Sequence, residues 1–483
     1  MADSTEASSP HPSTLGELRA AGYRPRSVRE ELRENLIRRM EDGSSLAGNL
    51  LGYEETVFPE IENAILSGHH MVLLGERGQG KSRLIRALVS LLDAEVPVVA
   101  GCDLHCDPLA PICASCEARI LADGDAMAVE WITPEKRYNE KLATPDVTMA
   151  DLIGEVDPIK IAEGRHLDDA EAIHFGLVPR AHRGIFAINE LPDLMEKIQV
   201  GLFNLMEERD VQIRGFSVRL PVDVVVLATA NPEDYTSHGR MITPLKDRFD
   251  AQIRTHYPRD LATEMAILDQ EVSLEPRAGR TVILPPFMKS ILARLTFAAR
   301  EAPEINQSSG VSVRVSINNL ETLIANAERR AVRNHASVIV PRISDLPAVA
   351  ASMLGKVELE YGAEGLGDDM RLLERLLGCA VRDEFAAQPP IEALGMVQQW
   401  FEDGGGIEVS DAMADEEYGE ALAGIEGLQA CVESLAGGES PAIVASTIEF
   451  LLEGLHLAER LNKESFGTRA DRVRYGEKES GRE

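Results

Sequence analysis

The sequence lacks any long run of apolar residues. None of its stretches approaches the ~20 residues that a membrane span needs, although 44% of the 483 residues are hydrophobic. The N-terminus, Met1 to about Thr14, is rich in Ser and Pro and has neither a basic start nor an apolar segment, so it does not resemble a secretory signal. We therefore expect a cytoplasmic protein, with a disordered leader and no membrane partner.

Positive charge is also scarce. The 49 Lys and Arg residues face 80 Asp and Glu residues, which gives a formal net charge of −31. Such a field repels polyanions, and the basic residues are scattered apart from short clusters such as Arg329 to Arg333. The sequence therefore makes nucleic acid an unlikely partner.

Cysteines number only six, but four of them fall within fifteen residues. In a cytosolic protein a tight quartet indicates metal before disulfides, and four thiolates can surround one Zn²⁺ tetrahedrally. We predict a structural zinc site; a redox pair, an iron–sulfur cluster or unligated thiols remain open, and His105 and Asp107 could compete as ligands. The predicted zinc ligands are Cys102, Cys106, Cys113 and Cys116.

The order of apolar patterns predicts an α/β domain followed by helices. Continuous apolar runs, typical of strands covered on both sides of a parallel sheet, alternate with helical patterns such as Leu191–Glu208 from about residue 45 to 257. The predicted strands are His70–Leu74, Val96–Ala100, Gly184–Ile188 and Val222–Ala228. The predicted divisions are a leader and N-terminal helix (1–44), the α/β core (45–257) with a cysteine insert at about 101–117, a helical lid (258–355), a helical C-terminal region (356–465) and a disordered tail (466–483).

A phosphate-binding loop is the strongest single motif. Residues 75–82 fit G-x-x-x-x-G-K-[S/T] between a predicted strand and a predicted helix. Backbone N–H groups of such a loop point at phosphates, the lysine neutralises them, and the hydroxyl of the last residue binds Mg²⁺. The predicted nucleotide ligands are Gly75, Glu76, Arg77, Gly78, Gln79, Gly80, Lys81 and Ser82.

Two further strand ends carry polar residues that suit ATP hydrolysis. Gly184–Ile188 leads into Asn189 and Glu190, where a P-loop enzyme places a magnesium-orienting acid and then a glutamate that activates water. Asn189 stands where an aspartate is expected, which weakens the predicted magnesium site by one charge. Val222–Ala228 leads to Asn231, whose amide can orient the attacking water.

Further motifs follow the phosphate loop along the chain. They are His174–Gly184, Asn204–Arg209 with Val211–Gly215, Asn231-Pro232-Glu233, Leu245-Lys246-Asp247-Arg248-Phe249 and Gly310–Arg314. Through these motifs the chain resembles, from about residue 50 to 330, AAA+ ATPases of the group formed by magnesium chelatase ATPase subunits and MoxR proteins. In this resemblance the last three motifs correspond to sensor 1, the arginine finger and sensor 2, and Thr148–Pro158 corresponds to an insert in the second helix of that group.

The resemblance implies a working ring. It implies a homo-oligomer, a hexamer, in which Arg248 reaches the neighbouring subunit's ATP, with Arg240 as a competitor, and in which Arg314 contacts the γ-phosphate. It also implies a partner protein bearing a von Willebrand factor A domain. Porphyrin metallation itself does not follow, because in such systems the porphyrin site lies on another subunit.

Three classes of function remain after this reading. The leading one is an ATP-hydrolysing ring ATPase, with Mg²⁺ as cofactor, that remodels or activates a partner protein. A nucleotide-gated scaffold with little turnover is the first alternative, because of Asn189. A nucleic-acid motor or sigma-54 transcriptional activator is the second, but the sequence lacks the activator's Gly-Ala-Phe-Thr-Gly-Ala loop.

Overall fold

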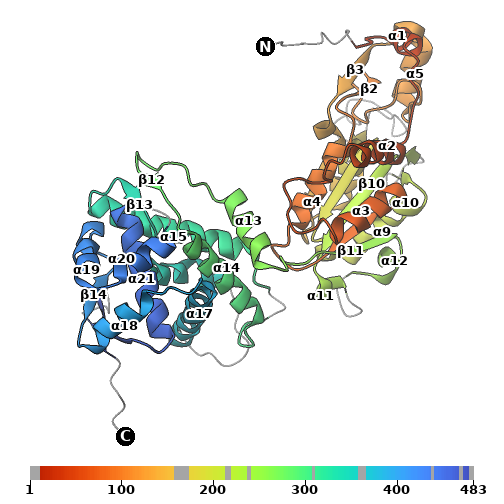
Figure 1. The fold of residues 1–483 in the computed structure, drawn as a ribbon. Coiled ribbons are helices and arrows are strands. Elements are labelled where there is room, and N and C mark those ends of the chain that lie inside the picture. Colours follow the sequence, from red (N-terminus) through yellow and green to blue (C-terminus); the bar gives the residue numbers. More distant parts are fainter. Residues whose placement is uncertain are drawn as a thin grey trace, which may run out of the picture. The chain divides into compact units, whose positions relative to one another are not determined.

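A computed structural model describes residues 11–156, 173–212, 219–235, 241–306, 310–356, 366–436, 440–466 and 472–477. The chain divides into two compact units, 1–256 and 257–483, and each is described by itself (Figure 1). Among the helices within these ranges, none is both long and apolar enough to cross a membrane.

The first unit is built on a five-stranded parallel sheet in the order β11-β1-β10-β7-β4. Every residue of β1, β7 and β10 is buried, as expected for continuous apolar strands covered on both faces. The predicted parallel α/β sheet is therefore confirmed. Its strands are β1 (Met71–Leu74), β4 (Tyr138–Leu142), β7 (Gly184–Asn189), β10 (Val224–Ala230) and β11 (Ala251–Arg254).

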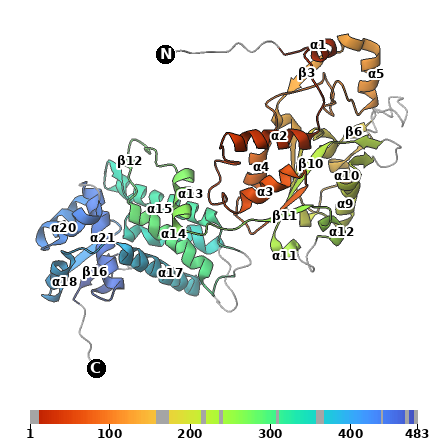
Figure 2. The same cartoon turned by 45° about the vertical axis from the view of Figure 1, so that its right-hand side comes forward.

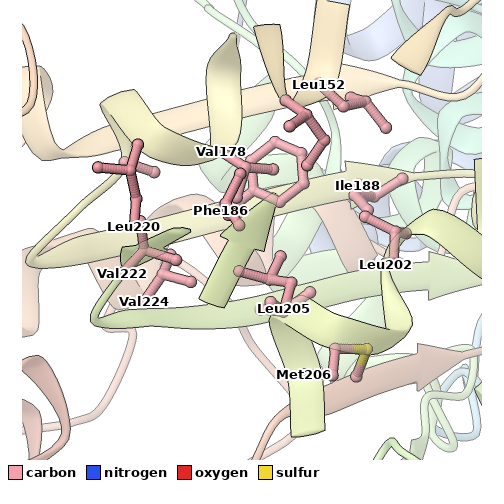
Figure 3. Close-up of a cluster of buried hydrophobic side chains, with 14 of the residues drawn as sticks. Leu152, Val178, Phe186, Ile188, Leu202, Leu205, Met206, Leu220, Val222 and Val224 are labelled. Atoms are coloured by element: carbon pink, nitrogen blue, oxygen red, sulfur yellow. The ribbon is translucent and has the colours of Figure 1, made fainter. Parts of the chain in front are cut away.

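Helices cover both faces of this sheet. Successive side chains of a strand point to opposite faces, so neighbouring residues pack against different helices. Ile185 of β7 packs with α2 (Val28–Glu41), α3 (Val57–Leu66) and α4 (Lys81–Leu88). The next residue, Phe186, packs on the other face with α8 (Leu177–Arg180), α9 (Glu196–Gly201) and α10 (Phe203–Glu207), in the cluster drawn in Figure 3. Figure 2 shows α2, α3 and α4 on one side of β10 and α9 and α10 on the other. The strand ends between these layers carry the polar residues of interest.

The predicted helix Leu191–Glu208 is broken in the structure. It consists of the turn η5 (Leu191–Asp193) followed by α9 and α10. Pro192 lacks a backbone N–H and Gly201 favours a break, so neither residue supports one continuous helix.

Among its described residues, the first unit also contains three two-stranded antiparallel pairs and several short helices. The predicted strand at Val96–Ala100 is present as β2 and belongs to one of these pairs, outside the main sheet. The pairs are β2 (Val96–Val99) with β3 (Val129–Ile132), β5 (Gly154–Val156) with β6 (Ile173–Phe175), and β8 (Asp210–Gln212) with β9 (Arg219–Pro221). The short helices are α1 (Leu15–Ala20), η1 (Val89–Leu91), α5 (Ala114–Asp123), η2 (Gly124–Ala126), η3 (Pro134–Arg137), α6 (Met149–Leu152), α11 (Pro232–Tyr235) and α12 (Thr243–Lys246).

The N-terminal segment is ordered earlier than predicted. Thr14 forms a β-bridge with Ala128, and the Leu15 N–H donates to Met127 O at 2.9 Å. The prediction of a disordered leader up to Thr14 was therefore wrong for residues 11–14, and residues 1–10 lie outside the described ranges. The reason is a pairing with a segment far along the chain, which local composition does not reveal.

The second unit, where the structure describes it, is mainly helical but contains two small sheets. The helices lie around one large apolar cluster and one smaller cluster. They are α13 (Leu261–Glu271), α14 (Pro286–Glu301), α15 (Val313–Arg333), η6 (Ile343–Val349), α16 (Ala350–Met353), η7 (Leu354–Lys356), α17 (Leu366–Ala387), α18 (Leu394–Glu402), η8 (Asp415–Glu417), α19 (Tyr418–Gly424), α20 (Leu428–Ala436) and α21 (Pro441–Leu457). The strands are β12 (Thr281–Val282), β13 (Val338–Ile339), β14 (Ile407–Ser410), β15 (Asn462–Phe466) and β16 (Arg472–Gly476).

These sheets correct two predictions. The lid region (258–355) is not wholly helical, because β12 pairs with β13. The tail predicted as disordered from residue 466 contains β16, which pairs with both β14 and β15. Its high charge suggested disorder, but its polar residues alternate with Val473 and the buried Tyr475, and that alternation suits a half-buried strand.

Candidate functional site

The predicted phosphate loop lies where its motif requires. It follows β1 and leads directly into α4, which begins at Lys81. Gly78 and Gly80 have φ values of 77° and 72°, in the left-handed region that glycine adopts without strain. The predicted strand–loop–helix setting is confirmed.

Close packing fixes the start of the loop at Gly75. A Cβ atom there would lie 1.9 Å from Thr255 Oγ1 and 2.2 Å from Gln79 Oε1. The Thr255 hydroxyl donates to Gln79 Oε1 at 2.7 Å, and the Glu76 N–H donates to the same oxygen at 3.2 Å. The Gln79 side chain is therefore held inside the loop. Gln79 can offer only its backbone to a ligand.

Lys81 occupies the cradle of the loop. Its ammonium donates to Glu76 O at 2.9 Å, to Gly75 O, and to Asn231 Oδ1 at 3.4 Å. The side chain is buried, and burial lowers the pKa of Lys81 to about 8. A bound phosphate would therefore meet a cation already placed beside the loop carbonyls.

The end of β7 meets the start of α4 at a cluster of oxygen atoms. Ser82 Oγ donates to Asn189 Oδ1 at 2.9 Å, and Thr229 Oγ1 donates to the same amide oxygen at 3.3 Å. Hydroxyl and amide oxygens can bind Mg²⁺ directly, or they can accept hydrogen bonds from water molecules bound to it. The residues present therefore fit a magnesium ion, with Ser82 and Asn189 as the predicted pair.

Glu190 lies one residue further, in a left-handed conformation with φ of 55°. Its N–H donates to Thr229 Oγ1 at 3.0 Å, and Asn231 Nδ2 donates to Glu190 Oε2 at 3.4 Å. The structure thus brings Lys81, Glu190 and Asn231 together, as the sequence predicted. A carboxylate beside an amide is suited to hold and polarise a water molecule.

Sequence reasoning missed Glu140 and Thr229. Glu140 lies on β4, and its carboxylate accepts hydrogen bonds from the Asn189 amide, from Tyr138 OH at 2.8 Å, and from Arg86 Nε and Nη2 at 2.9 and 2.8 Å. The hydrogen bond from Arg86 is the main cause that lowers the pKa of Glu140. The only available signal was a carboxylate in a short, mostly polar segment, and such segments are common elsewhere.

Of the two predicted arginines, Arg248 lies in the first unit with other partners, and Arg314 belongs to the second unit. Arg248 donates to Pro244 O at 2.8 Å, pairs with Glu207, and places its guanidinium 4.3 Å from the Phe203 ring centroid. Arg314 is exposed in the first turn of α15, behind the N-cap residue Ser312. The roles of Arg248 and Arg314 stay predictions, and Arg240 lies outside the described residues.

The cysteine quartet comes together in space. The four Sγ atoms all lie within 4.8 Å of one another, and tetrahedral zinc with Zn–S bonds near 2.3 Å needs sulfurs about 3.8 Å apart. All four thiols are free, with Cys106, Cys113 and Cys116 buried and Cys102 half-buried. Hydrogen bonds from the other three thiols lower the pKa of Cys102. The donor set therefore fits one zinc ion.

Asp107, an alternative ligand, is occupied elsewhere. Its carboxylate accepts from Tyr23 OH at 2.6 Å and pairs with Arg183 Nη2 at 3.2 Å. It connects the cysteine insert both to the N-terminal segment and to the residue that precedes β7. His105 is not in the group of side chains whose ligand atoms converge among the described residues.

Comparisons with known proteins agree with this architecture. A family profile described as "Sigma-54 interaction domain" matches residues 162–250. The magnesium-chelatase 38 kDa subunit of Acidiphilium rubrum is 30% identical over 222 residues, which cover 44% of this chain and 58% of that protein. The magnesium-chelatase subunit ChlI of a Nostoc species is 26% identical over 275 residues, 55% of this chain and 69% of that protein. The match to the first of these relatives thus spans little more than half of its length.

Solved structures include more distant likenesses. NtrX from Brucella abortus in complex with ADP has 14% identity and a TM-score of 0.37, covering 84% of this chain and 71% of that chain. A complex between BchI and BchD of magnesium chelatase has 20% identity and a TM-score of 0.31, covering 64% of this chain and 91% of that chain.

The parallel sheet, the phosphate loop and the relatives in sequence define the class: the chain is an AAA+ P-loop protein. Within that class it is similar to magnesium-chelatase subunits, at 26–30% identity over about half of this chain. The resemblance to MoxR proteins stays a prediction.

Proposed function

We propose that the chain binds ATP with Mg²⁺ and hydrolyses it. One observation carries the proposal: a buried lysine beneath the phosphate loop contacts Asn231, and Asn231 contacts Glu190. One hydrogen-bonded cluster thereby joins the Lys81 cation, which can bind phosphate, to the Asn231 amide and the Glu190 carboxylate, which can bind water. The AAA+ relatives support the same reaction.

Each side chain has a role in this proposal. The loop amides and Lys81 bind the phosphates, and for Arg314 we propose the γ-phosphate contact that the family resemblance implies. Ser82 and Asn189 hold the magnesium ion, which neutralises phosphate charge when bound. Glu190 accepts the proton of the attacking water, and Asn231 orients that water toward the γ-phosphate.

Phosphate release by the purified chain tests the reaction. Lys81→Ala should abolish nucleotide binding, whereas Glu190→Gln should keep binding and lower turnover by at least about 10²-fold. Glu60→Gln, an exposed carboxylate on α3, is the matched control and should leave the rate unchanged. Equal background release from the wild type and both site variants would remove hydrolysis from the proposal.

A scaffold that binds ATP with little turnover is the second candidate. Asn189 favours it, because this amide replaces a charge next to Ser82. Tight Mg²⁺-dependent ATP binding by wild type, with release no faster than that of Glu190→Gln, would select the scaffold over the ATPase.

A sigma-54 activator is not proposed. The matching profile covers β7, β10 and α12, which are the ATPase elements described above. The sequence lacks the Gly-Ala-Phe-Thr-Gly-Ala loop, and its net charge of −31 disfavours nucleic acid.

The proposal extends to assembly and partner. The chain forms a homo-oligomeric ring, a hexamer, that remodels or activates a protein bearing a von Willebrand factor A domain. The resemblance to magnesium-chelatase ATPase subunits supports both parts. Light scattering should give a hexamer mass for Glu190→Gln in ATP, and such a partner should co-purify with it but not with Lys81→Ala. A monomer in saturating ATP would contradict the ring.

The cysteine quartet holds a structural zinc ion in this proposal. The convergence of four sulfurs within one short insert supports it. Elemental analysis should give about one zinc per chain, and Cys116→Ser should lower both zinc content and melting temperature. Cys379→Ser, on α17, is the control that should change neither. Less than ~0.2 zinc per wild-type chain would exclude a zinc staple.

A further inference from the structure

The residue that replaces the expected aspartate is paired with a carboxylate on the neighbouring strand. β4 lies beside β7 at the sheet edge, with Glu140 opposite Ala187 and Leu142 opposite Asn189. Residues 140 and 142 point to the same face of the sheet, as do 187 and 189. The Glu140 carboxylate thereby reaches the Asn189 side chain.

This contact determines how the Asn189 amide is oriented. An ionised carboxylate can only accept hydrogen bonds, so the amide nitrogen must face Glu140. The amide oxygen must then face Ser82 and Thr229, whose hydroxyls both donate to it. Without Glu140 the amide could turn over and present N–H groups to the magnesium site, where they cannot act as ligands.

The same contact places a negative charge beside Asn189, on the neighbouring strand β4 rather than on β7. Arg86 and Tyr138 also donate to the Glu140 carboxylate, and Arg86 Nη2 donates to the same oxygen as the Asn189 amide. The guanidinium of Arg86 thus pairs with the Glu140 carboxylate. The carboxylate expected at the end of β7 is therefore present on β4 instead. An aspartate at 189 would place two carboxylates in contact, which is unfavourable for both.

We propose that Glu140 is a positioning residue of the nucleotide site, which orients the Asn189 amide toward Mg²⁺ and supplies the charge that Asn189 lacks. This inference rests on the proposed Mg·ATP function. It implies that restoring the expected aspartate at position 189 alone impairs the site. It also implies that the double variant Asn189→Asp with Glu140→Gln restores the site. In this variant the amide and the carboxylate are exchanged, and the introduced glutamine side chain can donate to the introduced aspartate.

Binding of a fluorescent ATP analogue, measured by anisotropy, tests this over a titration of Mg²⁺. Asn189→Asp and Glu140→Gln should each raise the Mg²⁺ concentration for half-maximal binding by about fivefold or more, roughly 1 kcal/mol. The double variant should return within about twofold of wild type. Binding in EDTA should stay unchanged in all three variants, which a general loss of structure would not allow.

Several outcomes would overturn the inference. Asn189→Asp equal to or better than wild type would do so, and so would a double variant no better than Glu140→Gln. If Asn189→Asp does not fold, the comparison of Glu140→Gln with the double variant still decides. A wild type that binds no nucleotide in Mg²⁺ would instead remove the proposed function, so the two failures are distinct.

Discussion

His70 is a single side chain whose ionisation state is determined by burial. It precedes β1, and its Nδ1 accepts from the Val226 N–H at 2.9 Å. Burial is the main cause that lowers the pKa of His70 to about 3, and Arg29, with Nη2 at 3.0 Å from Nε2, adds to it. Asp250 opposes the shift, while Arg209 and His69 reinforce it. The folded chain therefore keeps this imidazole neutral.

This neutrality makes stability depend on pH. An unfolded histidine has a pKa near 6.5, so between about pH 6.5 and 3 the unfolded chain binds a proton that folded His70 does not. The stability that the neutral His70 imidazole provides is complete above pH 6.5. By pH 5 the free energy of unfolding has fallen by about 2 kcal/mol. Urea unfolding of the first unit should show this loss, and His70→Asn, which keeps an acceptor for Val226, should reduce the slope. An unchanged slope would contradict the assignment to His70.

Gly75 gives a prediction about the phosphate loop itself. Gly75→Ala would drive a methyl group into Thr255 and Gln79, both of which brace the loop. We expect ATP affinity to fall at least about tenfold, or 1.4 kcal/mol. Gly48→Ala is the matched control, since a Cβ there meets no atom within 4 Å. Equal affinities in the two variants would show that the loop tolerates the methyl group.

Individual site residues were predictable to different degrees. Gly78, Gly80 and Lys81 were found because a phosphate loop needs those residue types at fixed spacing. Glu140 and Thr229 contact Asn189 across 49 and 40 residues of sequence. Such pairings follow from strand order, which the sequence pattern leaves open.

Among secondary-structure elements, β16 offers the clearest test. Tyr475 is buried, and its hydroxyl donates to the Glu453 carboxylate on α21. Tyr475→Ala should destabilise the second unit by about 3 kcal/mol, because a large buried ring is lost. Arg472→Ala, on the same strand but exposed, should change stability by less than about 0.5 kcal/mol.

Hydrogen exchange of the β14 amides is the measurement, because β14 pairs with β16 along its length. Exchange in Tyr475→Ala as slow as in Arg472→Ala would mean that β16 contributes little. That result would return residues 472–476 to the disordered tail predicted from composition.

Strands were predictable where both faces of the strand are buried. β1, β7 and β10 read as continuous apolar runs because both of their faces are covered. β4 was missed because it is an edge strand with polar residues along its length. β16 was missed because charge density was given more weight than the alternation around Val473 and Tyr475.

For the chain as an assembly, Arg248 separates a ring from independent subunits. In the proposed ring, Arg248→Ala leaves a subunit's own phosphate loop intact, whereas Lys81→Ala leaves its arginine intact. Mixing the two inactive variants should therefore create seams with both residues and restore part of the phosphate release. A mixture no more active than the average of the two variants would contradict action across subunits. Arg329→Ala, exposed on α15, should stay active alone.

The attachment of the N-terminal segment to β3 has a consequence for synthesis. Pro12 O accepts from Trp131 Nε1, 119 residues later in the chain. At about 5–20 residues per second, a ribosome needs on the order of ten seconds to make that interval. Leu15, which is fully buried in the finished fold, must stay exposed for that time. Residues 12–15 are thus made well before the segment that covers them in the finished fold.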